Sequence, residues 1–403
     1  MYQGIDYLKS KLATKQGRVN LRYKYYEMKN QTRDFNIVIP KEWTWLTACL
    51  GWCGTAVDSL ADRLVFREFG NDNFQLNEIF NMNSRDVLFD GAVRGACIAS
   101  CSFIYISADE TGYPRLQVID AYDATGILDP ITMMLSEGYA VLERDPKSHL
   151  PTVEAYFRKE DTWFYEKGRE PYSIPNPAPY PLLTPVIFKP DARRPFGHSR
   201  ISRACMEIMQ AAQRSMKRSE VTAEFYSFPQ KYVTGLSQDS EMLEKWKATV
   251  SSFLQFDKDE EGEAPKVGQF NQQSMAPFME QMRMLAQLFA GHTGLTVDDL
   301  GFSGENPSSA EAIKASHEIM RLTARAAQRS FSVGFLNAGY LAACVRDDYE
   351  YQRRQFYMTK ARWEPIFEPD VTSLAGIGDA INKLQQSFPD YFTEEKLQDL
   401  TGF

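Results

Sequence analysis

The sequence has few of the residues that most metal and catalytic sites need. Its 403 residues include 4 histidines and 6 cysteines. Cys49 and Cys53 are four positions apart, as are Cys97 and Cys101, so each pair can share a helical face. Structural zinc sites combine two close ligand pairs of C-x2-C or C-x4-C spacing, which is not the pattern here. We interpret these cysteines as buried core residues, and we expect no disulfide framework, no metal site and no cofactor.

Catalytic motifs are also missing from the chain. There is no G-x-x-x-x-G-K-[ST] segment to hold a phosphate. The pair of glycines in 376–378 lacks the third glycine of a dinucleotide site, and His317 is followed at the zinc-protease position by Arg321 instead of a second histidine. The segment 301–304 continues with Glu305, which breaks a nucleophile elbow. We therefore expect no catalytic residues and a protein that is not an enzyme.

Long apolar runs and an excess of positive charge are absent too. The longest uncharged apolar run is the twelve residues 95–106, whereas a membrane span needs ~20. Residues 1–15 contain no apolar core of a signal peptide. The formal charge of −8 disfavours a protein that reads a nucleic-acid sequence. With 43% hydrophobic and 24% charged residues, the composition is globular, and we expect a soluble protein from a reducing compartment with two or three domains of ~150 residues.

The first half of the chain changes from a helical to a strand pattern. The first hundred residues are predicted to be helical, with apolar stripes at 57–64 and 85–96. Short β-branched and aromatic segments between residues 102 and 165 then predict one antiparallel sheet of about five strands. Eight prolines between residues 171 and 195 predict an extended connector and a domain boundary, with one short strand at 185–190.

The second half is predicted to contain long helices joined by loops. A helix over 199–227 and a second over 275–289 flank an acidic stretch, in which a turn joins strands at 252–256 and 266–270. A glycine-containing loop follows and ends at Ser308, which forms a capping box with Glu311. The helix that starts there is predicted to reach about residue 349, with a bend near Gly334 or Gly339. A strand at 361–367 and helices at 374–386 and 393–400 are expected to close the chain.

The order of these segments resembles the portal proteins of tailed bacteriophages, in the form common in long-tailed siphoviruses. Each matching segment is short, but their order along the chain is specific. The segments are VDSLADRL (57–64), PFGHSRIS (195–202), EFYSFPQKYVTG (224–235), AGHTGL (290–295), LGFSGENPSSAEAIKASHEIM (300–320) and EPIFEPDVTSLAGIGDAINKL (364–384).

The resemblance implies an α+β fold, mainly α, and a channel at one capsid vertex through which double-stranded DNA is packaged and ejected. The implied partners are further copies of the chain in a ring of twelve, the terminase large subunit, head–tail adaptor proteins, major capsid and scaffold proteins, and double-stranded DNA without sequence specificity. It implies a virion protein made in the bacterial cytoplasm, with no membrane partner. The implied parts are a wing (1–198), a stem helix (199–227), a clip (228–273), a second stem helix (274–290), a tunnel loop (291–307), a helix that crosses the wing with a return strand (308–364) and a short helical crown (365–403).

Individual residues receive roles from the same resemblance. Acidic walls suit a conduit because many cationic contacts to phosphate would hold the DNA in place. The expected channel residues are Thr293, Thr296, Asp298, Asp299, Ser303, Glu305 and Asn306. The expected partner-docking residues are Asp257, Asp259, Glu260, Glu261 and Glu263, and the stem-packing residues are Ile201, Ile208, Met216, Phe278, Met282 and Phe289.

Two alternatives remain open at the level of sequence. A cytosolic enzyme would need a cluster of perturbed polar groups, which the motif search does not find. A different phage structural protein, such as a head–tail adaptor, would not need two long helices with a clip between them.

Overall fold

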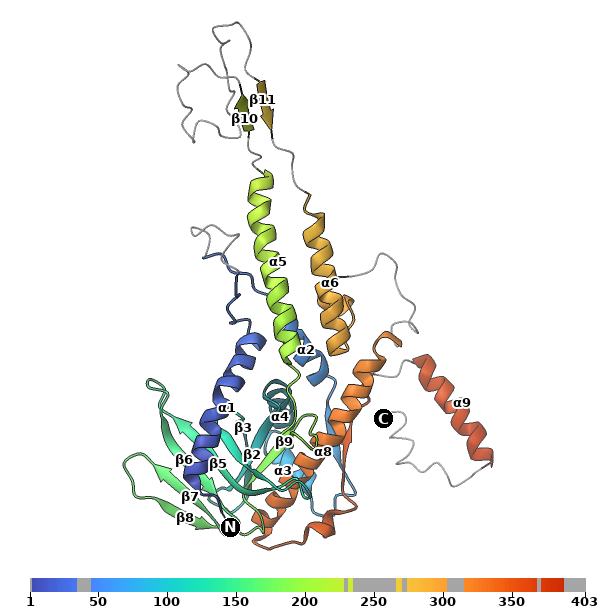
Figure 1. The fold of residues 1–403 in the computed structure, drawn as a ribbon. Helices are drawn as coiled ribbons and strands as arrows, with labels where there is room; N and C mark the ends of the chain where they lie inside the picture. Colours follow the sequence, from blue (N-terminus) through green and yellow to red (C-terminus); the bar gives the residue numbers. More distant parts are fainter. Residues whose placement is uncertain are drawn as a thin grey trace. The chain divides into compact units, whose positions relative to one another are not determined.

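A computed structural model describes residues 2–34, 45–227, 231–234, 266–269, 274–302, 315–367 and 371–387 (Figure 1). The chain forms two compact units. The first comprises residues 1–30, 51–206 and 290–403, and the second comprises 31–50 and 207–289. The Pro-rich segment 171–195, where the sequence predicts a domain boundary, lies within the first unit. The division falls instead inside two long helices, where apolar periodicity continues without interruption.

In the first unit, the strands between residues 101 and 187 form two antiparallel sheets where the sequence predicts one. The chain turns between residues 120 and 123, where the Asp120 carboxylate accepts the Tyr122 N–H at 2.6 Å. The strand after this turn pairs with the strand that follows it in the chain and not with the strand that precedes it. The three-stranded sheet has the order β3 (Pro114–Asp120), β2 (Cys101–Ala108), β9 (Leu183–Ile187). The five-stranded sheet has the order β4 (Ala124–Leu128), β5 (Leu135–Arg144), β6 (Pro151–Phe157), β7 (Asp161–Glu166), β8 (Tyr172–Pro175).

Prolines are compatible with both strands of the Pro-rich segment. Strand β8 is an exposed edge strand, so the missing N–H of Pro175 costs no bond within the sheet. Strand β9 is the fully buried edge of the other sheet and pairs with β2. The predicted strand at 185–190 therefore exists but begins two residues earlier, at Leu183.

Helix α1 (Ile5–Tyr26) packs on strands β5 and β6 (Figure 1). Its buried Leu8 and Leu12 join a small apolar cluster with tyrosines of both strands. The carboxylate of Glu137 on β5, which is 1% exposed, accepts the backbone N–H groups of Gln3 and Gly4 at 2.7 and 3.2 Å. A negative charge at this position also complements the dipole at the helix N-terminus. One buried acid thus fixes where α1 begins.

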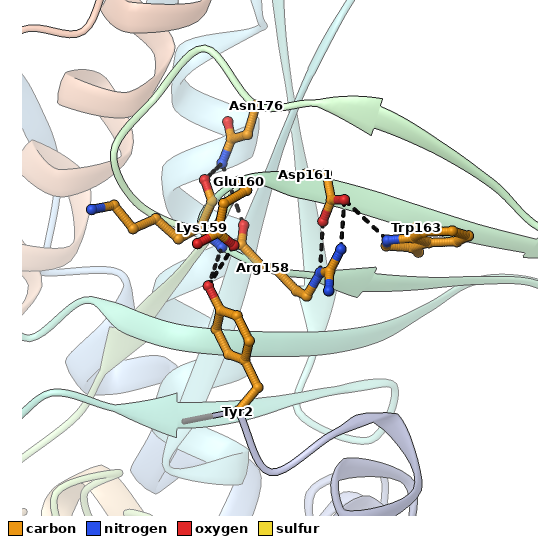
Figure 2. A network of polar contacts seen from close by, with 7 residues as sticks. All are labelled: Tyr2, Arg158, Lys159, Glu160, Asp161, Trp163 and Asn176. Carbon is orange, nitrogen blue, oxygen red and sulfur yellow. Dashed lines mark hydrogen bonds and ion pairs between the residues drawn. The ribbon is translucent and has the colours of Figure 1, made fainter.

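The turn between β6 and β7 is tied to the start of the chain by a polar network (Figure 2). The Tyr2 hydroxyl donates to Glu160 at 2.6 Å. The Arg158 guanidinium makes two bonds to the Asp161 carboxylate, at 2.7 and 2.6 Å, and the Trp163 indole N–H donates to the same carboxylate at 3.1 Å. The bidentate pair holds the two ends of the turn together.

An aromatic core joins the remaining helices of the first unit. Phe66 stacks on Phe89 with centroids 3.8 Å apart, and Phe89 contacts Phe335 at 4.0 Å. Phe66 lies on a strand, so the prediction that the first hundred residues are helical is wrong there; that strand pairs with a distant return strand, which local periodicity does not reveal. The elements are α2 (Trp52–Ala61), β1 (Phe66–Gly70), α3 (Leu76–Met82), α4 (Arg85–Ala99), α8 (Glu318–Asp347), a 3-10 turn η3 (Arg353–Phe356) and β12 (Lys360–Trp363), which pairs with β1.

Helix α8 is helical through both glycines at which the sequence predicts a bend. A Cβ atom at Gly334 would lie 2.9 Å from the carbonyl oxygen of Pro185 on β9, and one at Gly339 would lie 2.9 Å from Leu76. The two glycines therefore allow the helix to approach the sheet and α3 closely, as Figure 1 shows for α8 and β9.

The second unit is built from the long helices. Helix α5 (Arg203–Ser227) begins in the first unit and continues in the second, and α6 (Ala276–Thr293) does the reverse. Strand β11 (Lys266–Gln269) pairs with β10 (Lys231–Thr234). The sequence pattern predicts a turn between this strand and 252–256, which lies outside the described residues. In the first unit, α9 (Val371–Ser387) extends the helix predicted at 374–386, and the helix predicted at 393–400 also falls outside the described part.

Candidate functional surfaces

The end of α6 and the turn after it form the described part of the predicted tunnel loop. Thr293 is the last residue of α6 and is buried, so it belongs to the helix and not to a loop. Gly294 follows with φ +73°, and its N–H donates to Ala290 at 2.8 Å. This left-handed residue satisfies a helix-end carbonyl and turns the chain. A Cβ atom at Gly294 would lie 2.8 Å from Ile319, so glycine is needed for space as well as conformation.

A buried arginine holds this helix end in place. The Arg200 guanidinium donates to the carbonyl of Thr293 at 3.0 Å and to the carbonyl of Ala56 on α2, and it contacts the Met320 sulfur at 3.6 Å. Its backbone N–H donates to Cys97 at the end of α4 at 2.9 Å. Burial lowers the pKa of Arg200, yet a cation beside the C-terminal carbonyls of α6 is favourable. Arg200 thus connects four helices: α2, α4, α6 and α8.

The two aspartates of the turn differ in their surroundings: Asp299 is hydrogen-bonded, and Asp298 is exposed. Asp299 accepts the backbone N–H and the hydroxyl of Thr296, both at 2.8 Å, and lies 3.9 Å from the ring nitrogen of His317. Asp298 is exposed at the start of the 3-10 turn η2 (Asp298–Leu300). The structure therefore places Asp298 in solvent and gives Asp299 a local structural role.

His317 lies directly before the first residue of α8. The residue is partly buried and its ring lies 6.0 Å from that of Phe367. Its Nδ1 atom is buried and has no hydrogen-bond partner among the described residues.

The beginning of α5 differs from the prediction by four residues. Ser202 caps the helix, because its hydroxyl accepts the Cys205 N–H at 3.1 Å, and it also bonds the ring of His292 at 2.7 Å. Ile201 is buried but lies ahead of α5, so it is not a residue of the stem helix. The PFGHSRIS segment therefore provides both the cap of α5, Ser202, and the buried Arg200 that bonds the helix ends. Helical periodicity does not predict this role of Arg200.

In the second unit, α5 buries polar side chains. Lys217, with a side chain 5% exposed, forms an ion pair with Asp34 at 2.6 Å. The Gln210 amide accepts the N–H of Arg33 at 2.8 Å and donates to the carbonyl of Gln31 at 2.9 Å. The segment 31–34 is thus fastened along α5. These partners lie far away in sequence, so no local pattern predicts them.

Helix α6 leaves large apolar side chains in solvent. Met279, Met284 and Leu288 are 64%, 50% and 54% exposed. Of the predicted stem-packing residues, Phe289 is buried, and Ile208, Met216, Phe278 and Met282 are partly buried. We refer to Met284 and Leu288, four residues apart on one face of α6, as the α6 apolar face.

Several predicted site residues fall outside the described part of the chain. They are the docking residues Asp257, Asp259, Glu260, Glu261 and Glu263, the loop residues Ser303, Glu305 and Asn306, and the capping pair Ser308 and Glu311. Within the described ranges, no three His, Cys, Asp or Glu side chains gather as a metal site would require. No described helix combines the length and the apolar character of a membrane span.

The chain is similar to two curated phage proteins. It is 25% identical to the portal protein of Mycobacterium phage L5 over 316 residues and 24% identical to the portal protein of Mycobacterium phage D29 over 326 residues. Each match covers 72% of this chain and 64% of the relative, so the chain spans less than two thirds of the length of these relatives. No protein-family profile matches. The resemblance noted in the sequence is confirmed by these relatives.

Matches among solved structures come from gene transfer agent particles. One is from the neck of an empty particle computed with C6 symmetry, with a TM-score of 0.47, and one is from the neck of a native particle computed with C12 symmetry, with a TM-score of 0.48. Both are 12% identical to this chain and cover 87% of it; the matches cover 90% and 89% of the two solved chains.

Proposed function

We propose that this chain is the portal protein of a tailed bacteriophage, a ring of identical subunits through which double-stranded DNA enters and leaves the capsid. The observation that carries the proposal is the similarity to two phage portal proteins over 72% of the chain. The proposal includes a structural role without catalytic activity. It assigns residues 1–198 to the wing, the long helices to the stem, and the short helical C-terminal segment to the crown.

The α6 apolar face supports assembly. Met284 and Leu288 are each at least half exposed on one helix, and exposed apolar groups of this size are typical of surfaces that a partner covers. In a ring, the partner is the next subunit. Methionine suits such a contact because its flexible side chain adapts to an adjacent surface.

The turn after α6 supports a channel role. Asp298 is the exposed carboxylate of this turn, and a ring would repeat it once per subunit. Negative charges on a channel wall repel phosphate, so DNA slides without forming lasting cation–phosphate contacts. Asp299 is already occupied by Thr296, so the repulsive charge is assigned to Asp298.

The remaining partners are assigned to the acidic segment 236–266. We place the docking of the terminase large subunit, and later of the head–tail adaptors, on Asp257, Asp259, Glu260, Glu261 and Glu263. Charge reversal at these positions is expected to weaken partner binding while rings remain intact. Unchanged packaging and tail joining in that variant would show that the segment is only a solvated turn.

Mass measurement and electron microscopy test the ring. Native mass spectrometry of the purified protein should give many times the 46.1 kDa subunit mass, and negative-stain images should show rings with a central channel. Met284→Glu with Leu288→Glu should shift the mass towards single subunits. Gln287→Glu, an exposed position on the same helix, is the matched control and should leave rings intact. A monomer at all concentrations and inside procapsids would refute the proposal.

Labelling tests the channel role of Asp298. In a Cys49→Ser background, which removes the one exposed cysteine, a bulky maleimide on Asp298→Cys should slow DNA packaging and ejection by assembled particles. The control is Lys147→Cys, in an exposed turn of the first unit. If the label attaches fully at Asp298→Cys and both processes keep their rates, the turn does not line the channel.

A further inference from the structure

A cavity in the first unit is lined by five cationic side chains, although the chain as a whole is acidic. Its volume is about 570 Å³, within the range of small-ligand pockets. Four of its cations come from one face of α1, at the helical spacing i, i+4, i+7 and i+11. They are Lys11, Lys15, Arg18 and Arg22, and the loop before α5 adds Arg194.

These cations are held by neutral groups. Lys11 donates to the carbonyl of Gly126 at 2.7 Å, Lys15 to that of Ala124 at 2.5 Å, and Arg22 to that of Ala99 at 2.8 Å. No carboxylate in the described parts of the chain lies within ion-pair distance of any of the five. Each ammonium has three donors and each guanidinium five, so most of the donors in the cavity remain available.

The nearest acids are committed to other partners. Asp120 accepts the Tyr23 hydroxyl at 2.6 Å and the Tyr122 N–H at 2.6 Å, and burial raises its pKa. Glu137 is occupied by the start of α1 and by the Tyr156 hydroxyl at 2.8 Å. Neither carboxylate neutralises the cavity by direct contact. Burial accordingly lowers the pKa values of Lys11, Lys15 and Arg22.

Burying like charges without counterions is unfavourable, so the arrangement is best explained by a ligand. We propose that the cavity binds a small anion that carries at least two phosphate groups and is the size of a nucleotide. Lysine and arginine side chains are the usual donors for phosphate oxygens, and five of them match a ligand with several negative charges. Phe196, whose ring lies 5.2 Å from the Lys11 nitrogen, and Tyr7 add an apolar wall that suits a flat base.

The half-buried setting favours a small anion over a polymer. Lys11, Lys15 and Arg22 are partly buried between α1 and neighbouring carbonyls. The phosphate backbone of a nucleic-acid duplex could reach them only if the duplex were distorted. Arg18 and Arg194 are exposed and lie at the rim that an entering ligand meets first. This inference does not depend on the portal function, because it rests on the cavity alone.

Isothermal titration with inorganic pyrophosphate and with ATP, without divalent cations, tests the proposal on the full chain. Both should bind, adenosine should not, and added salt should weaken binding because the contacts are electrostatic. Arg18→Gln, which alters an exposed side chain, should raise the pyrophosphate Kd about tenfold or more, the equivalent of one charge-assisted bond. Lys24→Gln, an exposed position of α1 outside the cavity lining, should leave it unchanged.

Thermal stability provides a second readout. Pyrophosphate should raise the melting temperature of the wild type by several degrees, whereas Lys15→Met should melt no lower than the wild type without ligand and gain little from pyrophosphate. The proposal fails if pyrophosphate and ATP do not bind at millimolar concentration, or if Lys24→Gln weakens binding as much as Arg18→Gln. It also fails if only a single-stranded oligonucleotide binds, or if binding disappears when rings are dissociated.

Discussion

Arg200 provides the sharpest test of how the first unit is held together. Replacing it with methionine removes two hydrogen bonds from the guanidinium, one to Thr293 and one to Ala56. A bond that involves a charged group contributes about 1.5–3 kcal/mol. Part of the loss is offset because methionine removes the cost of burying a charge, which is the cause of the lowered pKa of Arg200. We expect a net destabilisation of about 2–3 kcal/mol.

Urea unfolding monitored by tryptophan fluorescence measures this difference at one fixed protein concentration. Arg203→Met, which removes an exposed arginine at the start of α5, is the matched control and should change stability by less than about 0.5 kcal/mol. Arg200→Lys should be intermediate, because one ammonium keeps the charge but lacks the planar fork that reaches two carbonyls. If Arg200→Met is as stable as Arg203→Met, Arg200 does not hold the helix ends.

Three further predictions concern glycines and thiols. Gly334→Ala should destabilise by about 1–3 kcal/mol in urea unfolding, because the added Cβ lies 2.9 Å from a backbone carbonyl of β9; a stabilised variant would disprove the close approach of α8. Gly294→Ala should cost more than Gly301→Ala in the same assay, since both have positive φ but only the first meets a neighbour, at 2.8 Å; equal costs would show that backbone conformation alone matters. A maleimide near pH 8 should label exposed Cys49 at once and buried Cys344 only after unfolding, because burial raises the pKa of Cys344 to about 11; fast loss of both thiols would contradict the packing of α8.

Much of the secondary structure follows from local periodicity. The helices at 203–227 and 276–293 lie within a few residues of the ranges that apolar stripes predict, and the helix at 318–347 lies inside the range predicted from Ser308 to about residue 349. The observed helix ends differ from the predicted ones because capping interactions determine where a helix begins. Ser202 caps α5 through its hydrogen bond with Cys205, and it is also hydrogen-bonded to His292. A side chain ninety residues away cannot be read from a local pattern.

The sequence by itself determined the α+β class, the long helices, the strand-rich middle and the order of segments that matches the phage portal proteins. These depend on periodicity and on short motifs, which are local. Tertiary structure alone decided the split into two sheets, the pairing of β1 with β12, the engagement of Asp299 by Thr296, and the Arg200 junction. It also decided that the four cations of α1 face a cavity, although their spacing is visible in the sequence. Spacing places side chains on one face of a helix, but whether that face meets carboxylates, carbonyls or solvent depends on strands that are distant in the chain.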